Sequence, residues 1–332
     1  MTTTTFQTSR PARRGSAPEA LPQLDRRPLN PTQLDKAAFV LALPFSLSTG
    51  VANNPWMQDL SDQDRRPDFD TAMRQWLSLY HFIASESVVY PLPSRGDCAL
   101  QDLVYVANLG IVLDHLPGKD TAIISRFRSP PRVPEAELGV AFFESLGYTT
   151  AQPPYDFEGE AELKHLHDNV YVGGYGIRSD IRAYEWMEEQ FGMTVVKLKE
   201  TDPYLYHLDC TVFPLTREAT LVCTELYDTA EVQALERHTD IVDVSLDDCY
   251  AGICNSVRLS NTILNASHIG DLRAGTAEYS SEVGKNRQLE DIAASHGFEL
   301  SLFNLSEYHK SGALLSCMVM HLNRHSYEFT LT

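Results

Sequence analysis

One cysteine lies where the chain could present a reactive thiol. Cys317 follows a basic, glycine-containing turn that begins at Lys310 and includes Gly312, and it stands at the start of an apolar strand. A thiolate is a nucleophile, but most free cysteines are simply small buried hydrophobic residues. A catalytic role for Cys317 therefore needs a proton-transfer group and substrate-binding groups from other segments.

A histidine and an aspartate could supply part of that chemistry. His207 and Asp209 lie in the apolar segment 205–215, which we interpret as a strand, so their side chains are expected to face the same side. A thiol and an imidazole at the ends of separate strands can act as a nucleophile and proton-transfer pair. A lone histidine in such a strand is more often a satisfied core residue. Two inward titratable groups, however, need a ligand or a partner.

Three further polar segments could complete a site. Glu158, Glu160 and Glu162 alternate along 157–163, and in an extended segment they would face one way and could bind a cation, although at the surface they would be unremarkable. Asn108 is a polar residue within the otherwise apolar strand 103–113, where its amide can donate or accept. Arg128 is suited to a bidentate grip on a carboxylate.

Composition narrows the classes of protein and ligand. The chain has 332 residues, of which 43% are hydrophobic, enough for a large core in one domain or two. Its net charge of −18 disfavours nucleic acid and anionic membranes as partners and is compatible with cationic small molecules. No apolar run approaches the roughly 20 residues that span a bilayer, and no signal peptide is evident, so we expect a cytoplasmic protein.

The six cysteines indicate neither a zinc site nor a disulfide framework, because no paired ligand spacing occurs among them. Residues 1–33 have few large apolar side chains and are predicted to be a disordered tail. Residues 34–332 are predicted to be a single catalytic domain.

The order of predicted elements repeats along that domain. A pair of strands is followed by a helix and a short closing strand, and the first helix ends before Gly147. The strand pairs lie within 103–127, 155–175, 205–226, 253–267 and 315–331, and four of them are followed by helices at 134–146, 179–191, 230–238 and 283–296. The helix and closing strand missing from the last unit are found at 69–84 and 88–90.

Element order therefore predicts an α/β fold, a closed five-bladed α/β propeller built from ββαβ units. A doubly wound sheet is the alternative, but that fold expects single strands alternating with helices.

Taken together, these segments resemble the guanidino-group modifying (pentein, or amidinotransferase-like) superfamily. The resemblance extends from Phe39 onward and is closest to its arginine dihydrolase, dimethylarginine hydrolase and arginine deiminase branch. The motifs that carry it are Asn54-Pro55-Trp56-Met57, Ala107-Asn108, Phe157-Glu158-Gly159, Tyr206-His207-Leu208-Asp209 and Lys310-Ser311-Gly312 ahead of Cys317. That superfamily has a five-bladed α/β propeller fold.

The resemblance also assigns roles. It makes Cys317 the nucleophile and His207 the proton carrier, with Glu158 holding the histidine in its charged form. The substrate-binding positions that it implies are Asp209, Asn108, Glu162, Arg128 and Asn54. It implies neither a metal nor an organic cofactor.

Two departures from the family pattern put the identity of the substrate in question. Ala313 and Leu314 stand where glycines are usual, and Glu162 stands where an aspartate is usual. Asn108 occupies a position that is aspartate in deiminases, which favours the dihydrolases.

The expected function is a cysteine-dependent hydrolase acting on the guanidinium group of arginine or a close derivative. It would form an amidino-cysteine intermediate and release ammonia and ornithine. An amidinotransferase with an amine acceptor, a deiminase that forms citrulline and a non-catalytic propeller that binds ligands are the alternatives. The expected partner is a small guanidino compound, and a homo-oligomer is left open.

Overall fold

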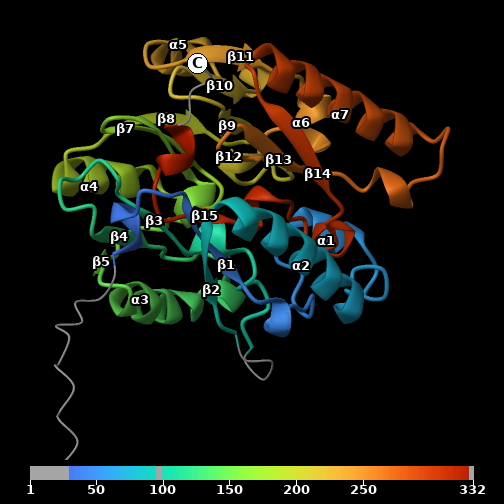
Figure 1. The fold of residues 1–332 in the computed structure, drawn as a ribbon, viewed down its shortest axis with the longest axis horizontal. Helices are drawn as coiled ribbons and strands as arrows, with labels where there is room; N and C mark the ends of the chain where they lie inside the picture. Colours follow the sequence, from blue (N-terminus) through green and yellow to red (C-terminus); the bar gives the residue numbers. More distant parts are fainter. Residues whose placement is uncertain (1–29, 95–98, 329–332) are drawn as a thin grey trace, which may run out of the picture.

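The computed structural model describes residues 30–94 and 99–328. Its strands form five three-stranded sheets. Helices α3, α4, α5 and α7 lie at the outside, while β15, β1 and β3 lie toward the middle (Figure 1). No helix within these residues is both long enough and apolar enough to cross a membrane.

Each sheet is one ββαβ unit, in which the first strand pairs antiparallel with the second and the second pairs parallel with the third. The first four units contain, in order, β3 (Gly110–Val112), β4 (Thr121–Ile124), α3 (Glu135–Ser145) and β5 (Thr149–Ala151); β6 (Leu163–His167), β7 (Val170–Tyr175), α4 (Ile181–Phe191) and β8 (Thr194–Lys199); β9 (Val212–Pro214), β10 (Ala219–Val222), α5 (Thr229–Glu236) and β11 (Asp240–Asp243); and β12 (Val257–Leu259), β13 (Thr262–Ala266), α7 (Ala277–Ser295) and β14 (Glu299–Phe303). Short helices α1 (Pro55–Asp59), α6 (Leu246–Tyr250) and α8 (Ser306–His309) lie in the connections.

The fifth unit joins the two ends of the chain. Strand β15 (Met320–His321) pairs antiparallel with β1 (Ala38–Ala42), which pairs parallel with β2 (Val88–Leu92), and α2 (Phe69–Glu86) precedes β2. The wrap-around order was predicted, but the strand pair expected within 315–331 is wrong. Among the described residues this segment supplies only β15, and β1 is its antiparallel partner.

Local sequence signals explain the helices. The Asp68 side chain accepts a hydrogen bond from the Thr71 N–H at 2.8 Å and caps α2, as expected from its position before the apolar stripe. The buried face of α2 includes Trp76, Leu79 and Ile83. Helix α3 ends shortly before Gly147, whose φ of +86° is the left-handed conformation predicted there.

The predicted tail falls mainly on residues 1–29, which lie outside the described residues, as does Cys98. Pro31–Gln33, within the range assigned to the tail, instead forms a 3-10 helix that packs on the domain. The Thr32 hydroxyl donates to the Leu322 carbonyl at 2.7 Å. These three residues therefore belong to the folded part of the chain.

The first strands of the units begin on the side of the molecule that carries the candidate site. Strand β3 lies beside β15, and β6 lies beside β9. The segments that enter four of these strands are 3-10 helices: η3 (Val106–Leu109), η5 (Gly159–Ala161), η6 (Leu208–Cys210) and η9 (Ser316–Met318). Every first strand therefore has an entry end and a far end, which we call the hairpin end because in four units the chain turns there toward the second strand. The entry ends of β3, β6, β9 and β15 carry predicted site residues.

Candidate active site

The entry end of β15 presents the predicted nucleophile. Cys317 lies in η9 and is 7% exposed. Its Sγ lies 3.6 Å from Asp209 Oδ2 and 3.5 Å from Asn255 Nδ2. Asp209 Oδ2 also accepts a hydrogen bond from the Ser316 hydroxyl at 2.6 Å, so the carboxylate holds the turn that carries the thiol.

Burial, and after it the negative charge of Asp209, raises the pKa of the Cys317 thiol to about 12. The thiol in the empty site is therefore neutral at pH 7. Because a nearby cation would offset both causes, the arrangement favours a thiolate only when a positively charged ligand lies beside Asp209.

His207 and Glu158 form a second pair of side chains. His207 Nε2 lies 2.8 Å from Glu158 Oε2, and both side chains are buried. The Asn108 amide nitrogen lies 3.3 Å from the same ring nitrogen. Since a carboxylate only accepts hydrogen bonds, Nε2 carries the ring proton, and Nδ1 is left as the basic nitrogen.

Burial and neighbouring charges shift the pKa of both members of this pair. Burial alone would raise the pKa of Glu158, but the hydrogen bond from His207 and the charge of Arg178 hold it at about 2. Burial lowers the pKa of His207, although Glu158 opposes that shift. The lowered pKa favours a neutral imidazole, one that can accept a proton, and the charged form of His207 that the resemblance implies stays a prediction.

A glycine allows Glu158 to approach the Asn108 turn. Gly159 has a φ of +67°, and a Cβ added there would lie 2.5 Å from the Ala107 carbonyl oxygen. Any other residue would push η5 away from η3. The Phe-Glu-Gly sequence thus combines the acid with the backbone that positions it.

The three alternating acids do not face one way, because the segment that carries them is not extended. They lie on or beside the 3-10 turn η5, where side chains two apart diverge. Glu158 contacts His207, Glu160 accepts from the His321 N–H at 2.8 Å and from its ring, and Glu162 accepts from the Leu208 N–H at 3.2 Å. His207 and Asp209 do not share a strand face either. His207 caps η6, and Asp209 lies within it, ahead of β9.

Glu162 belongs to a buried carboxyl pair. It lies next to Glu200, and both carboxyl groups lie against Gly174. Burial and the neighbouring Glu200 raise the pKa of Glu162 well above its usual value, and burial raises the pKa of Glu200 to about 8. At least one of the two is therefore protonated at neutral pH. Contact between Glu162 and a guanidinium stays a prediction.

Asn54 and Arg128 lie apart from the cysteine. The Asn54 side chain accepts from the Met57 N–H at 2.9 Å, which caps α1, and it donates to the Ser311 carbonyl at 2.9 Å. Arg128 is exposed and donates to the Ile177 carbonyl at 2.9 Å. Both residues line one pocket of about 440 Å³. Their substrate-binding roles stay predictions.

Three residues of this region escaped the sequence reasoning. Arg178 lines the same pocket, with Nη1 3.6 Å from Glu158 Oε1 and its guanidinium over the Tyr206 ring. Asn255 accepts from the Ser316 N–H at 2.8 Å and so fixes the cysteine turn. Glu200 forms the carboxyl pair. Asn255 could have been found, because it precedes β12 in the same way that Asn108, Asp209 and Cys317 precede their strands.

The loop before the cysteine is held on both sides. Gly312 has a φ of +73°, and its carbonyl accepts a hydrogen bond from the Tyr206 hydroxyl at 3.3 Å. Ala313 is buried in the hydrophobic core, and Leu314 packs against that core. Residues larger than the glycines usual in this loop are therefore accommodated by packing.

Comparison with known proteins places this geometry among enzymes. No family model matches the chain. It is 27% identical over 292 residues to the N(G),N(G)-dimethylarginine dimethylaminohydrolase of Mycobacterium tuberculosis, which covers 86% of this chain and 85% of that protein. It is 25% identical over 289 residues to the bifunctional arginine dihydrolase/ornithine cyclodeaminase AgrE of Nostoc sp., which covers 85% of this chain and 37% of that protein.

A solved structure agrees in fold. The product-bound N-terminal domain of ArgZ, an arginine dihydrolase from cyanobacteria, has a TM-score of 0.74 at 23% identity, and the match covers 87% of this chain and 98% of that domain. The prediction of the five-bladed pentein fold is confirmed. The homologues are guanidino-modifying hydrolases, as the resemblance implied.

Proposed function

We propose that this homologue of guanidino-modifying hydrolases hydrolyses the guanidinium group of arginine or a close derivative through a covalent amidino-cysteine. One observation carries the proposal: the Cys317 thiol lies 3.6 Å from the buried Asp209 carboxylate. A cation at that carboxylate would neutralise the charge that keeps the thiol protonated. A guanidinium fits because it is a cation and presents an electrophilic carbon.

Binding and activation are then one event. The guanidinium donates charge-assisted hydrogen bonds to Asp209, which brings its carbon toward Sγ. With the positive charge in place, the thiol proton passes to the neutral His207 at Nδ1. The Glu158 carboxylate stabilises the imidazolium that results, since its own pKa of about 2 keeps it ionised.

Bond changes follow from this proton inventory. The thiolate attacks the guanidinium carbon, a C–N bond breaks, and His207 returns its proton to the departing amine. The carbon stays bonded to Sγ as an amidino-cysteine. His207 then takes a proton from water, the oxygen bonds to the carbon, and the C–S bond breaks to restore the thiolate.

The dihydrolase outcome is the finer part of the proposal. Two such hydrolyses convert arginine and two waters into ornithine, two ammonia molecules and carbon dioxide. The neutral Asn108 amide beside His207 supports this outcome, because it leaves that side of the imidazole without a second carboxylate. The related ArgZ domain is an arginine dihydrolase that was solved with its product.

Product analysis tests the proposal. The enzyme is incubated with arginine and with dimethylarginine, and ornithine, citrulline and ammonia are followed by mass spectrometry and an ammonia assay. Cys317→Ala should abolish turnover while arginine still binds in calorimetry. Cys223→Ala removes a buried thiol from a different hydrophobic cluster and should remain active. Undiminished turnover by Cys317→Ala, or no hydrolysis of either compound, would end the proposal. Citrulline as the final product would restrict it to a deiminase.

A further inference from the structure

A second pocket lies at the hairpin end of the first strands, away from the proposed active site. Its volume is about 420 Å³. It is lined by residues that follow or end first strands: Asp114 and His115 after β3, His165, Leu166 and His167 in β6, Asp168 and Asn169 in the turn after it, Arg217 after β9, and Arg324 and Tyr327 after β15. Three units therefore contribute a hairpin, and the fifth contributes the segment after β15.

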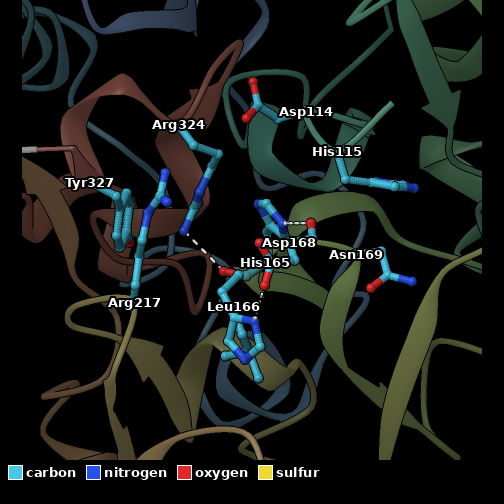
Figure 2. A pocket seen from close by; sticks show the side chains of 10 residues that line it. Asp114, His115, His165, Leu166, Asp168, Asn169, Arg217, Arg324 and Tyr327 are labelled. Atoms are coloured by element: carbon cyan, nitrogen blue, oxygen red, sulfur yellow. Dashed lines mark hydrogen bonds and ion pairs between the residues drawn. The ribbon is translucent and has the colours of Figure 1, made fainter. Parts of the chain in front are cut away.

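Two arginines and two aspartates line this pocket. Figure 2 shows the side chains of Arg217 and Arg324 on the same side of the pocket as Tyr327. The positive charges of both act on His165, whose pKa falls to about 3, chiefly through burial and then through Arg324. Both guanidinium groups therefore lie within electrostatic reach of one point, and His165 is neutral.

These guanidinium groups are only partly used by the protein. Arg324 donates to the His165 carbonyl at 3.0 Å and lies over the Tyr327 ring at 3.7 Å, which leaves most of its five N–H donors for other partners. Arg217 is exposed and has no hydrogen-bond or ion-pair partner among residues 30–94 and 99–328. Neither arginine is neutralised by a paired carboxylate within that part of the chain.

The acids in and near the pocket contact other side chains than the two arginines. Asp114 lies 3.4 Å from the Lys119 ammonium. The Asp168 side chain is 85% exposed and lies 3.2 Å from His167 Nδ1. Glu160, below the pocket, is held by His321. Neither carboxylate of the lining is paired with Arg217 or Arg324, so both guanidinium groups face the pocket without an ion-pair partner among residues 30–94 and 99–328.

The imidazoles do not make a cation site. His115 bonds to the Tyr171 hydroxyl at 2.8 Å and the Phe191 carbonyl at 3.1 Å, and His165 bonds to the Asp168 carbonyl at 2.7 Å. No group of three or more His, Cys, Asp or Glu in the described residues could hold a metal ion. A cation would also be repelled by the two arginines.

We propose that this pocket binds a small organic anion that carries phosphate or carboxylate groups, gripped by Arg217 and Arg324. Guanidinium groups recognise both oxyanions through paired hydrogen bonds. The volume is within the range of small-molecule sites and exceeds what a single inorganic ion fills. The pocket differs from the proposed active site in its position and in the side chains that line it.

Calorimetry on the full chain in low-chloride buffer tests the proposal with three probes: citrate, AMP and inorganic phosphate. At least one organic probe should bind with one-to-one stoichiometry at sub-millimolar concentration. Binding by citrate alone identifies a carboxylate ligand, and binding by AMP alone identifies a phosphate ester. Arg217→Gln should weaken that binding about tenfold, since a hydrogen bond to a charged group contributes about 1.4 kcal/mol or more.

Three variants make the result specific. Arg217→Lys keeps the charge without the fork and should weaken binding less than Arg217→Gln. Arg182→Gln removes an exposed arginine of α4 that pairs with Asp180, and it should leave binding unchanged. Cys317→Ala should also bind the anion normally, so the test does not depend on the proposed reaction. No saturable binding of any organic probe, or equal binding by the wild type and Arg217→Gln, would overturn the proposal.

Discussion

The two ends of the first strands differ in the ionisable side chains that they carry. At the entry end the acids Glu158, Glu162 and Asp209 are fully buried. At the hairpin end Arg217 and Arg324 line a pocket of about 420 Å³ together with Asp114 and Asp168. The strands between them have only two to five residues, so the two ends are separated by roughly 7–17 Å.

This difference shows how one scaffold supports two kinds of charge. Carboxyl, thiol and imidazole groups can change protonation when buried, so the entry end holds a neutral thiol and a neutral imidazole until a cation arrives. Arginine stays charged at any physiological pH and therefore has to remain near solvent or near an anion. The entry end is suited to proton transfer and the hairpin end to steady attraction.

The comparison depends most on Asp209, whose replacement should have the largest effect. Asp209→Asn keeps the shape but removes the anion that we propose binds the guanidinium, and kcat/KM should fall by about 10³-fold or more, in line with the 2–5 kcal/mol cost of losing one partner of a buried charge pair. Without that negative charge the thiol pKa should fall, so alkylation of Cys317 in the empty enzyme should become faster.

Steady-state kinetics and iodoacetamide labelling followed by peptide mass spectrometry measure these two effects on one protein. If hydrolysis and labelling both slow down, Asp209 is holding the loop and not setting the charge of the site.

Glu158 and Glu160 provide a sharper comparison, since they are two residues apart and serve opposite ends. Glu158→Gln should lower kcat by about 10²–10⁴-fold, because the imidazolium loses its counter-charge. Glu160→Gln breaks the buried pair with His321 and should lower the free energy of unfolding by about 3 kcal/mol or more, while kcat of the folded fraction stays nearly unchanged.

Urea unfolding and kcat of both variants decide this point. If Glu160→Gln loses as much kcat as Glu158→Gln, the two ends are not separated as described.

The neutral thiol makes the reactivity of Cys317 depend on pH and on ligand. A thiol with a pKa of about 12 has about one thiolate in 10⁵ at pH 7, and the fraction rises about tenfold per pH unit below the pKa. Alkylation of the empty enzyme should therefore be slow at pH 7 and rise steadily up to pH 10. Guanidinium chloride at non-denaturing concentration should accelerate it at pH 7, with sodium chloride as the ionic-strength control.

Slow labelling of the enzyme without a ligand therefore does not favour a non-catalytic propeller. A pH-independent rate, or no response to guanidinium, would contradict the account of the site.

The carboxyl pair should have the smallest effect. Because the folded-state pKa of Glu200 is raised from 4.5 to about 8, the pair contributes most to stability at low pH and loses that contribution as pH rises from about 5 to 8. Glu200→Gln mimics the protonated form, so it should be nearly neutral at pH 5 and stabilising by about 2 kcal/mol at pH 8. Thermal unfolding at both pH values measures this, and an effect of the same size at both would mean that the pair does not share a proton.

Element order was enough to predict the ring, because strand pairs, helices and Gly147 are encoded locally. The conformation of the site residues was not predictable in this way. Segments such as 103–109 and 205–210 are apolar and buried, which favours a strand on composition, yet their backbones are satisfied by 3-10 bonds such as Asn108 N–H to the Tyr105 carbonyl at 3.2 Å. Burial alone does not distinguish these two solutions.

Contacts between residues of different units were also not predictable from the sequence. Asn255 and Arg178 contact the site from units other than the one that supplies Cys317, and only the closed ring brings them together. Which end of the strands a side chain serves also depends on the turn of η5, since that turn sends Glu158 and Glu160 apart.

The junction of β1 with β15 has a consequence for the newborn protein. The Ala38 N–H bonds to the Asn323 side chain across 285 positions of the chain. Since synthesis proceeds from the N-terminus, β1 leaves the ribosome long before its partner, and such distant contacts are slow to form. Cys317 emerges only three residues before β15. A nascent or prematurely terminated chain therefore has neither the assembled acids nor the thiol in place, so activity appears only in molecules whose translation has run past the last blade.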